Sequence, residues 1–195
     1  HLFMTIQWML SSFANEGKAF FIAIWAAGFL LLVKSKKAKV YQSLAVVFSV
    51  VALLPYAGIS FFSEMGIGYI DIEQCLTELP TWQTMTTQNR IAFFWWIAAV
   101  LFTLVLLWKV TGHSVFISMV FLGGIASEAV LHFSPTIYAS GARVYYLTDL
   151  MYLFIILWMV MHMDSEKKKN LFIAGVVVLG VANFLSQYSI MLLKL

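Results

Sequence analysis

The sequence predicts an all-α fold, a polytopic bundle of about six transmembrane helices. Three observations predict it. Apolar residues make up 62% of the 195-residue chain and charged residues only 11%, whereas about a quarter of the residues in a soluble domain are charged. The mean hydropathy is +0.90. The apolar residues also gather into runs of about twenty, which fit membrane-spanning helices and are too long for the alternating segments of a transmembrane barrel.

Six apolar segments follow one another along the chain. They are 19–33, 40–62, 91–108, 114–133, 145–163 and 171–193. The first is short, but the long side chains of Lys18 and Lys34 extend its reach towards the roughly 30 Å of a hydrocarbon core. Pro55 predicts a kink near the end of the second segment. The short connection 109–113 predicts that the third and fourth segments form a tight antiparallel hairpin.

The polar segments predict structures at the membrane surface. Residues 1–13 mix apolar and polar types, and predict an interfacial helix or the end of a truncated segment. Within the long polar stretch 63–90, residues 71–79 place Ile72, Leu76 and Leu79 at helical spacing, which predicts a short amphipathic surface helix. Because no repeat or second compositional region is present, we predict that residues 1–195 form a single transmembrane helical domain.

Two local patterns predict how the helices pack. The aromatic run 93–96 and Trp108 stand at the two ends of the third segment, which is typical of interfacial aromatic belts. Gly123 and Gly124 in the fourth segment predict a close approach to a neighbouring helix, because small residues let helix backbones come together in membranes.

The distribution of charge orients the bundle. Loops 34–39, 109–113 and 164–170 carry eight lysines against two acids, and the opposite side carries four cations and seven acids. The positive-inside rule makes the three loops cytoplasmic, which predicts a multi-pass protein of the cell membrane with an acidic outer face. Both termini then lie outside. Since neither an initiator methionine nor a signal peptide precedes the first segment, we expect the C-terminal part of a longer protein; the alternative is a short tail translocated unaided.

Several kinds of site are excluded or disfavoured. The single Cys75 excludes an internal disulfide and any cysteine-cluster metal site. No metal-ligand spacing is present, so we predict neither a metal nor a cofactor. The lysine runs predict contacts with the anionic lipids of the inner leaflet rather than with nucleic acid.

The connection between the fourth and fifth segments carries the candidate site. Glu128 and His132 are four residues apart and share one helix face, Arg143 follows a Ser-Gly turn, and Asp149 lies in the next segment. Tyr138 adds a hydroxyl donor. An ionisable residue in hydrocarbon costs roughly 2.5–3.5 kcal/mol on insertion scales, so such residues have either a partner or a function.

Three interpretations of this connection remain open. In the first, Arg143 binds a phosphate or carboxylate of a polar substrate at the outer surface through paired N–H donors. In the second, Glu128 or Asp149 acts as a general base, whereas in the first either acid only orients Arg143. In the third, an ion pair within the bundle ties the fourth segment to the fifth, and His132 is satisfied by backbone.

Residues 133–143, Phe-Ser-Pro-Thr-Ile-Tyr-Ala-Ser-Gly-Ala-Arg, precede a tyrosine-rich segment. Together they resemble the later transmembrane part of bacterial GT-C glycosyltransferase-like membrane proteins of surface-polysaccharide pathways. The resemblance implies a polyprenyl-phosphate-linked sugar as donor, used at the outer face of the cell envelope, with Arg143 close to the substrate. In that family the catalytic acid lies in the first external loop, which would precede residue 1, so the catalytic residue here is unassigned.

The sequence therefore supports two functional hypotheses. The first is an envelope glycosyltransferase-like membrane protein that takes a lipid-linked sugar. The second is a non-enzymatic membrane bundle, either a transporter subunit or an accessory or immunity-type protein that binds partner membrane subunits. The absence of a repeated half or of a pair of broken helices argues against the transporter form.

Overall fold

The computed structural model describes residues 6, 9–10, 12–13, 17–33, 35, 38–54, 87–132 and 146–192. Over these residues the chain forms helices and no strand. The helices are α2 (Lys18–Leu32), α3 (Lys39–Leu53), α5 (Thr87–Val110), α6 (Val115–His132), α8 (Tyr146–Met161) and α9 (Glu166–Leu192). Each of the six predicted segments overlaps one of them, so the all-α prediction is confirmed for this part of the chain.

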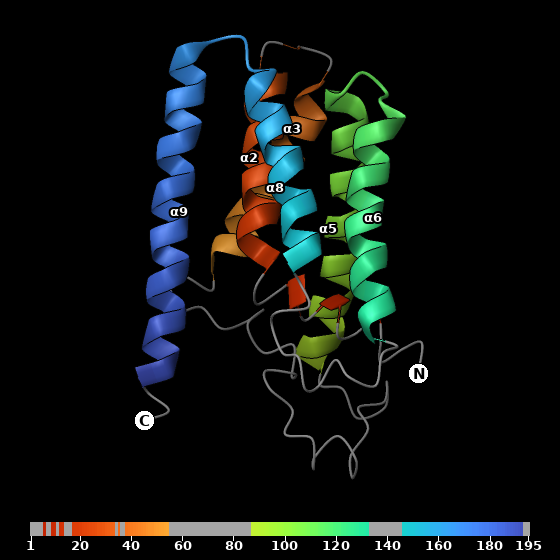
Figure 1. The fold of residues 1–195 in the computed structure, drawn as a ribbon, viewed down its shortest axis with the longest axis vertical. Helices are drawn as coiled ribbons and strands as arrows, with labels where there is room; N and C mark the ends of the chain where they lie inside the picture. The colour runs from red at the N-terminus through yellow and green to blue at the C-terminus, as the bar shows by residue number, and fades with distance from the viewer. Residues whose placement is uncertain are drawn as a thin grey trace.

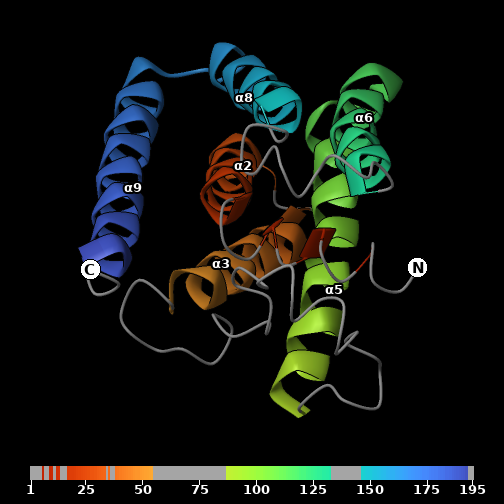
Figure 2. The ribbon, with the colours of Figure 1, turned by 60° about the horizontal axis from the view of Figure 1, so that its bottom comes forward.

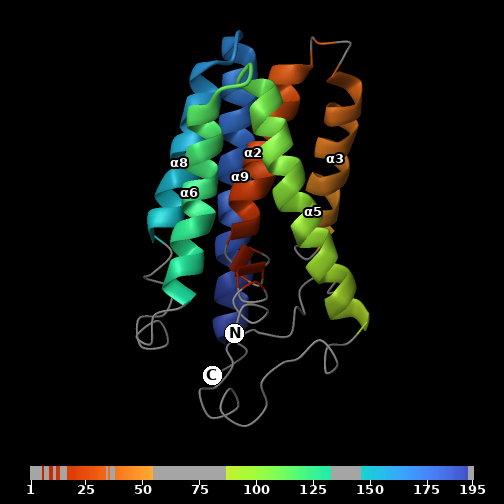
Figure 3. The same cartoon turned by 90° about the vertical axis from the view of Figure 1, so that its right-hand side faces the viewer.

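Successive helices alternate in direction along a common axis (Figures 1 and 3). Helices α3, α6 and α9 begin at the end that carries the lysine-rich connections, which we call the lysine end. Helices α2, α5 and α8 begin at the opposite end. An oblique view shows α2 in the middle of the bundle, and α2 contacts α3, α5, α8 and α9 (Figure 2).

Helix α2 occupies the centre because it is apolar on every face. Its Phe21, Ile24 and Trp25 are fully buried, and a helix that is apolar all round is stable only when other elements or lipid surround it. Small residues allow its neighbours to come close. A Cβ atom at Gly28 would lie 2.8 Å from Leu106 Cδ2 of α5, so only glycine fits this contact as it stands.

Aromatic rings from four helices fill the interior. The Phe21 ring contacts those of Trp96, Phe121 and Tyr152 at centroid distances of 5.5, 6.1 and 5.7 Å. The only polar atom of the buried Trp25 side chain, Nε1, donates a hydrogen bond of 2.8 Å to Thr103 Oγ1 of α5. Because this bond satisfies the indole N–H, Trp25 can lie in the core at little cost.

The predicted interfacial aromatic belt is wrong for two of the four aromatic residues in the run 93–96. Phe93 and Trp96 are buried, while Phe94 is exposed. Trp95 packs against Trp25 and Phe48. Helix α5 begins at Thr87, so the run lies two turns inside the helix, and residues three apart share the face that meets α2.

The predicted basic loop 164–170 is also wrong from its third residue onward, because α9 begins at Glu166. Lys168 Nζ lies 3.0 Å from Asp164 Oδ1, and Lys169 Nζ lies 2.8 Å from Glu166 Oε1. Pairs of opposite charge three or four residues apart stabilise a helix in water. The helix therefore starts within the charged segment, ahead of the apolar run.

One described helical segment, Arg90–Val110 of α5, is long and apolar enough to cross a membrane. The segments Lys18–Leu32, Lys39–Leu53, Val115–Val130 and Tyr146–Met161 are apolar but shorter. A helix of 15 residues rises only about 22 Å, against roughly 30 Å of hydrocarbon. A single such helix is weak support for membrane association. The predicted kink at Pro55 and the predicted surface helix 71–79 lie outside the described residues.

Candidate functional site

A cluster of hydroxyl groups joins α6 to α8. Ser127 Oγ lies 2.8 Å from the Gly124 carbonyl oxygen, Thr148 Oγ1 lies 3.2 Å from the same oxygen, and the two hydroxyl oxygens are 3.1 Å apart. A Cβ atom at Gly124 would lie 3.2 Å from Tyr152 Cε1 of α8. Glycine at this position therefore lets α8 approach closely enough for Thr148 to reach the α6 backbone, as the sequence predicted.

Glu128 lies one turn beyond Gly124 on α6 and is only 1% exposed. Tyr152 of α8 is equally buried. Among the described residues, the Tyr152 hydroxyl has no hydrogen-bond partner. Its ring packs against those of Phe20, Phe21 and Phe121. The site is thus a polar region enclosed by aromatic side chains.

Asp149 lies in the first turn of α8 and is partly exposed. The unpaired N–H groups and the dipole of a helix favour a carboxylate at this position. Its neighbour Thr148 is 3% exposed and faces α6. The structure therefore places both predicted acids, Glu128 and Asp149, near the same end of the α6–α8 pair, opposite the lysine end (Figure 3).

The other predicted site residues are only partly placed. His132 is the last residue of α6, so the helix does extend from Glu128 to His132 as predicted. The side chain of His132, and all of Tyr138 and Arg143, lie outside what the structure describes. The pairing of Arg143 with Glu128 or Asp149 stays a prediction.

Three residues of this region were not predicted as parts of a site. Lys18 was expected at the membrane interface, yet its side chain is buried, with 8% exposed. It begins α2 at the same end of the bundle as Glu128 and Asp149. Thr148 and Tyr152 are four residues apart beside Asp149, and this helical spacing is the signal that could have identified them.

The arrangement offers carboxylates and hydroxyls but no metal site. Within the described ranges, no group of three or more His, Cys, Asp and Glu side chains is placed to hold a metal ion. Asp149 is partly exposed and can hydrogen-bond a ligand at the bundle end, whereas Glu128 is enclosed within the bundle. Comparisons with family models, curated proteins and solved structures gave no match to this chain.

Proposed function

We propose that this chain is a multi-pass membrane protein whose lysine end lies in the cytoplasm. All six helices carry apolar runs, and exposed apolar side chains cover the outside of the bundle, among them Val40, Val130 and Val178. Contiguous apolar surface of this kind needs a cover, and lipid tails supply one on every side. The described lysines of the three connections lie at a single end, which supports the orientation; they are Lys39, Lys109, Lys167, Lys168 and Lys169.

Cysteine labelling tests the orientation. Ser35→Cys and Ser165→Cys place one thiol each in the connections 34–39 and 164–170. Both are made in a Cys75→Ser background, which removes the native thiol. We expect an impermeant maleimide to label neither thiol in intact cells and both after permeabilisation. Labelling of either from outside would reverse the orientation and transfer the acidic end to the cytoplasm.

We further propose that the outer end binds a polyprenyl-phosphate-linked sugar and that the protein acts as an envelope glycosyltransferase. The observation that carries the proposal is the grouping of Glu128 and Asp149 at the end opposite the lysines, around a buried hydroxyl cluster. Arg143 would hold the phosphate, Asp149 and Tyr138 would hydrogen-bond the sugar, and Glu128 with His132 would position these groups. The enzyme class itself rests on the resemblance of residues 133–143.

Ligand-induced stabilisation in detergent tests this role. Polyprenyl phosphate should raise the melting temperature of the wild type. Arg143→Lys should fold normally yet bind about tenfold more weakly, because lysine cannot make two parallel hydrogen bonds to phosphate. Asp164→Asn, at the opposite end, is the matched control and should retain wild-type binding. Equal stabilisation of the wild type and Arg143→Ala would exclude the phosphate site.

The second candidate is a non-enzymatic bundle, and one observation favours it. Glu128 and Tyr152 are each 1% exposed, as expected of groups that hold two helices together. If Arg143 only neutralises a carboxylate, Arg143→Ala should cost about 3–5 kcal/mol by leaving a charge buried. Replacing that acid as well should then recover most of the loss, with no dependence on ligand.

A further inference from the structure

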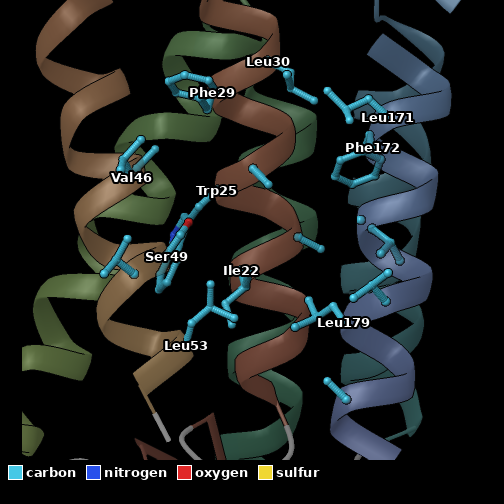
Figure 4. Close-up of a pocket in the computed structure, with 18 residues that line it drawn as sticks. Ile22, Trp25, Phe29, Leu30, Val46, Ser49, Leu53, Leu171, Phe172 and Leu179 are labelled. Atoms are coloured by element: carbon cyan, nitrogen blue, oxygen red, sulfur yellow. The ribbon is translucent and has the colours of Figure 1, made fainter. Parts of the chain in front are cut away.

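A long apolar groove runs between α2, α3 and α9 (Figure 4). Its volume is about 570 Å³, within the range of roughly 300–1,000 Å³ that holds small molecules. Eighteen residues line it, and their side chains carry only two polar groups, one of which is the hydroxyl of Ser49. The indole N–H of Trp25, the other polar group, is already bonded to Thr103. The groove therefore suits a hydrocarbon chain.

One end of the groove is basic. Lys168 of α9 donates a hydrogen bond of 2.9 Å to the carbonyl oxygen of Leu30, a residue that lines the groove. Gln42 of α3 donates to the Leu32 carbonyl oxygen at 2.6 Å. Both walls are thus attached to carbonyl groups at the C-terminal end of α2. Lys39, the exposed first residue of α3, lies at this same end.

Charge remains available at this end. An ammonium group has three N–H donors, and within the described part of the chain Lys168 Nζ uses two of them, on Leu30 and on Asp164. An anionic group held at the end of the groove would therefore meet the ammonium groups of Lys168 and Lys39 and at least one unused donor.

We propose that this groove binds a phospholipid of the inner leaflet, with its acyl chains along α2 and its anionic headgroup at Lys168 and Lys39. The apolar lining and the basic end match the two parts of such a lipid. A partner helix would match the lining but would not require the lysines. The inference depends on the proposed membrane setting and is independent of the outer-end site.

Gly175 and Gly180 of α9 provide a matched pair of variants. A Cβ atom at either position would meet no atom within 4 Å, so both accept a side chain without a clash. Gly175 lines the groove, whereas Gly180 does not. Gly175→Phe should fill the groove and Gly180→Phe should leave it open, with the same change of composition and helix propensity.

The experiment measures lipid retained by the detergent-solubilised chain in native mass spectrometry, with phosphatidylglycerol and phosphatidylcholine of identical acyl chains. We expect the wild type to retain phosphatidylglycerol about fivefold better, since one lysine at a membrane surface contributes roughly that factor. Gly175→Phe should lower retention of both lipids about tenfold, and Gly180→Phe should not. Lys168→Gln should lower the preference for phosphatidylglycerol, and Lys168→Arg should keep it.

Three outcomes would overturn the proposal. They are equal retention of the two lipids by the wild type, equal behaviour of the two glycine variants, and a lipid-free dimer that Gly175→Phe dissociates, which would assign the groove to a second copy. If Gly175→Phe does not fold, crosslinking of the wild type with a phosphatidylglycerol that carries a photoreactive acyl chain tests the groove instead. Crosslinks should then concentrate in residues 45–53 and 171–182 of the wild type, and an even spread over α6 would contradict the groove. Loss of polyprenyl-phosphate binding would leave these results unchanged.

Discussion

Helices α8 and α9 both carry long apolar runs but pack against the bundle in opposite ways. Helix α8 buries Thr148, Tyr152, Ile155, Ile156 and Met159 against its neighbours. Helix α9 buries Phe172 alone among its described side chains, although it is the longest helix, at 27 residues. Its main contact is with α2, and it lies at the edge of the bundle (Figures 1 and 2).

The difference shows what an apolar helix needs in order to pack closely. In the proposed membrane setting, apolar character alone does not make two helices pack closely, because lipid tails are as apolar as the side chains that replace them. Helix α8 packs closely on α6 because the ring of Tyr152 lies against Gly124. The hydroxyl groups of Ser127 on α6 and Thr148 on α8 also both lie within hydrogen-bond distance of the Gly124 carbonyl oxygen. Helix α9 has glycines as well, but no neighbour lies within 4 Å of their Cβ positions. Shape and polar contacts therefore decide which helices join tightly.

Replacing glycine in each helix should give the largest contrast. Gly124→Leu inserts a side chain where even a Cβ atom would lie 3.2 Å from Tyr152, and overpacking of this kind costs about 3 kcal/mol at the upper end of its usual range. Gly180→Leu adds the same atoms to open space and should change stability by less than about 0.5 kcal/mol. Denaturant unfolding in mixed micelles measures both. Equal losses would mean that α6–α8 packing is no tighter than that of α9.

Removing one hydroxyl should have a smaller effect on the same contact. Thr148→Val keeps the shape of the side chain but loses the oxygen that lies near Gly124 and Ser127. We expect a loss of about 1 kcal/mol, typical of one hydrogen bond in a membrane or in a core. The double variant with Ser127→Ala should lose less than the sum of the single variants, because the hydroxyls share one acceptor. Strict additivity would show that the two groups act separately.

The sequence predicted the helices well because the signal for them is local. Runs of apolar residues between charged connections located all six helices, and the pair Gly123-Gly124 located the closest contact of α6. The cost of placing ionisable residues in apolar segments also directed attention to Glu128 and Asp149, which the structure places near the same end of two packed helices. Each of these inferences depends only on neighbours in the sequence.

The inferences that failed concern which neighbour a side chain meets. The apolar side chain of Trp96 fits either a membrane interface or a protein core. It is buried because it packs against Phe21 of α2, a contact that the local sequence does not reveal. Lys18 was expected to extend its side chain towards water, yet the residue is buried, with 8% exposed. The groove was equally out of reach, since it exists only because α9 lies apart from α3 along one side of α2.

The smallest predicted effect concerns the attachment of α9 itself. Lys168 Nζ donates to Leu30 O of α2, whereas Lys169 Nζ pairs with Glu166 within α9. Lys168→Met should therefore loosen α9 and speed hydrogen exchange over residues 166–180, at a cost of about 0.5–1 kcal/mol for one lost hydrogen bond. Lys169→Met is the matched control, and exposed pairs within one helix contribute only about 0.3–0.5 kcal/mol. Exchange should stay unchanged in α8 for both variants, because α8 is joined to the bundle by its own buried contacts. If Lys168→Met and Lys169→Met gave the same exchange rates in α9, the bond to Leu30 would contribute nothing to its attachment, and the apolar packing of Phe172, Val176 and Leu179 would hold the helix.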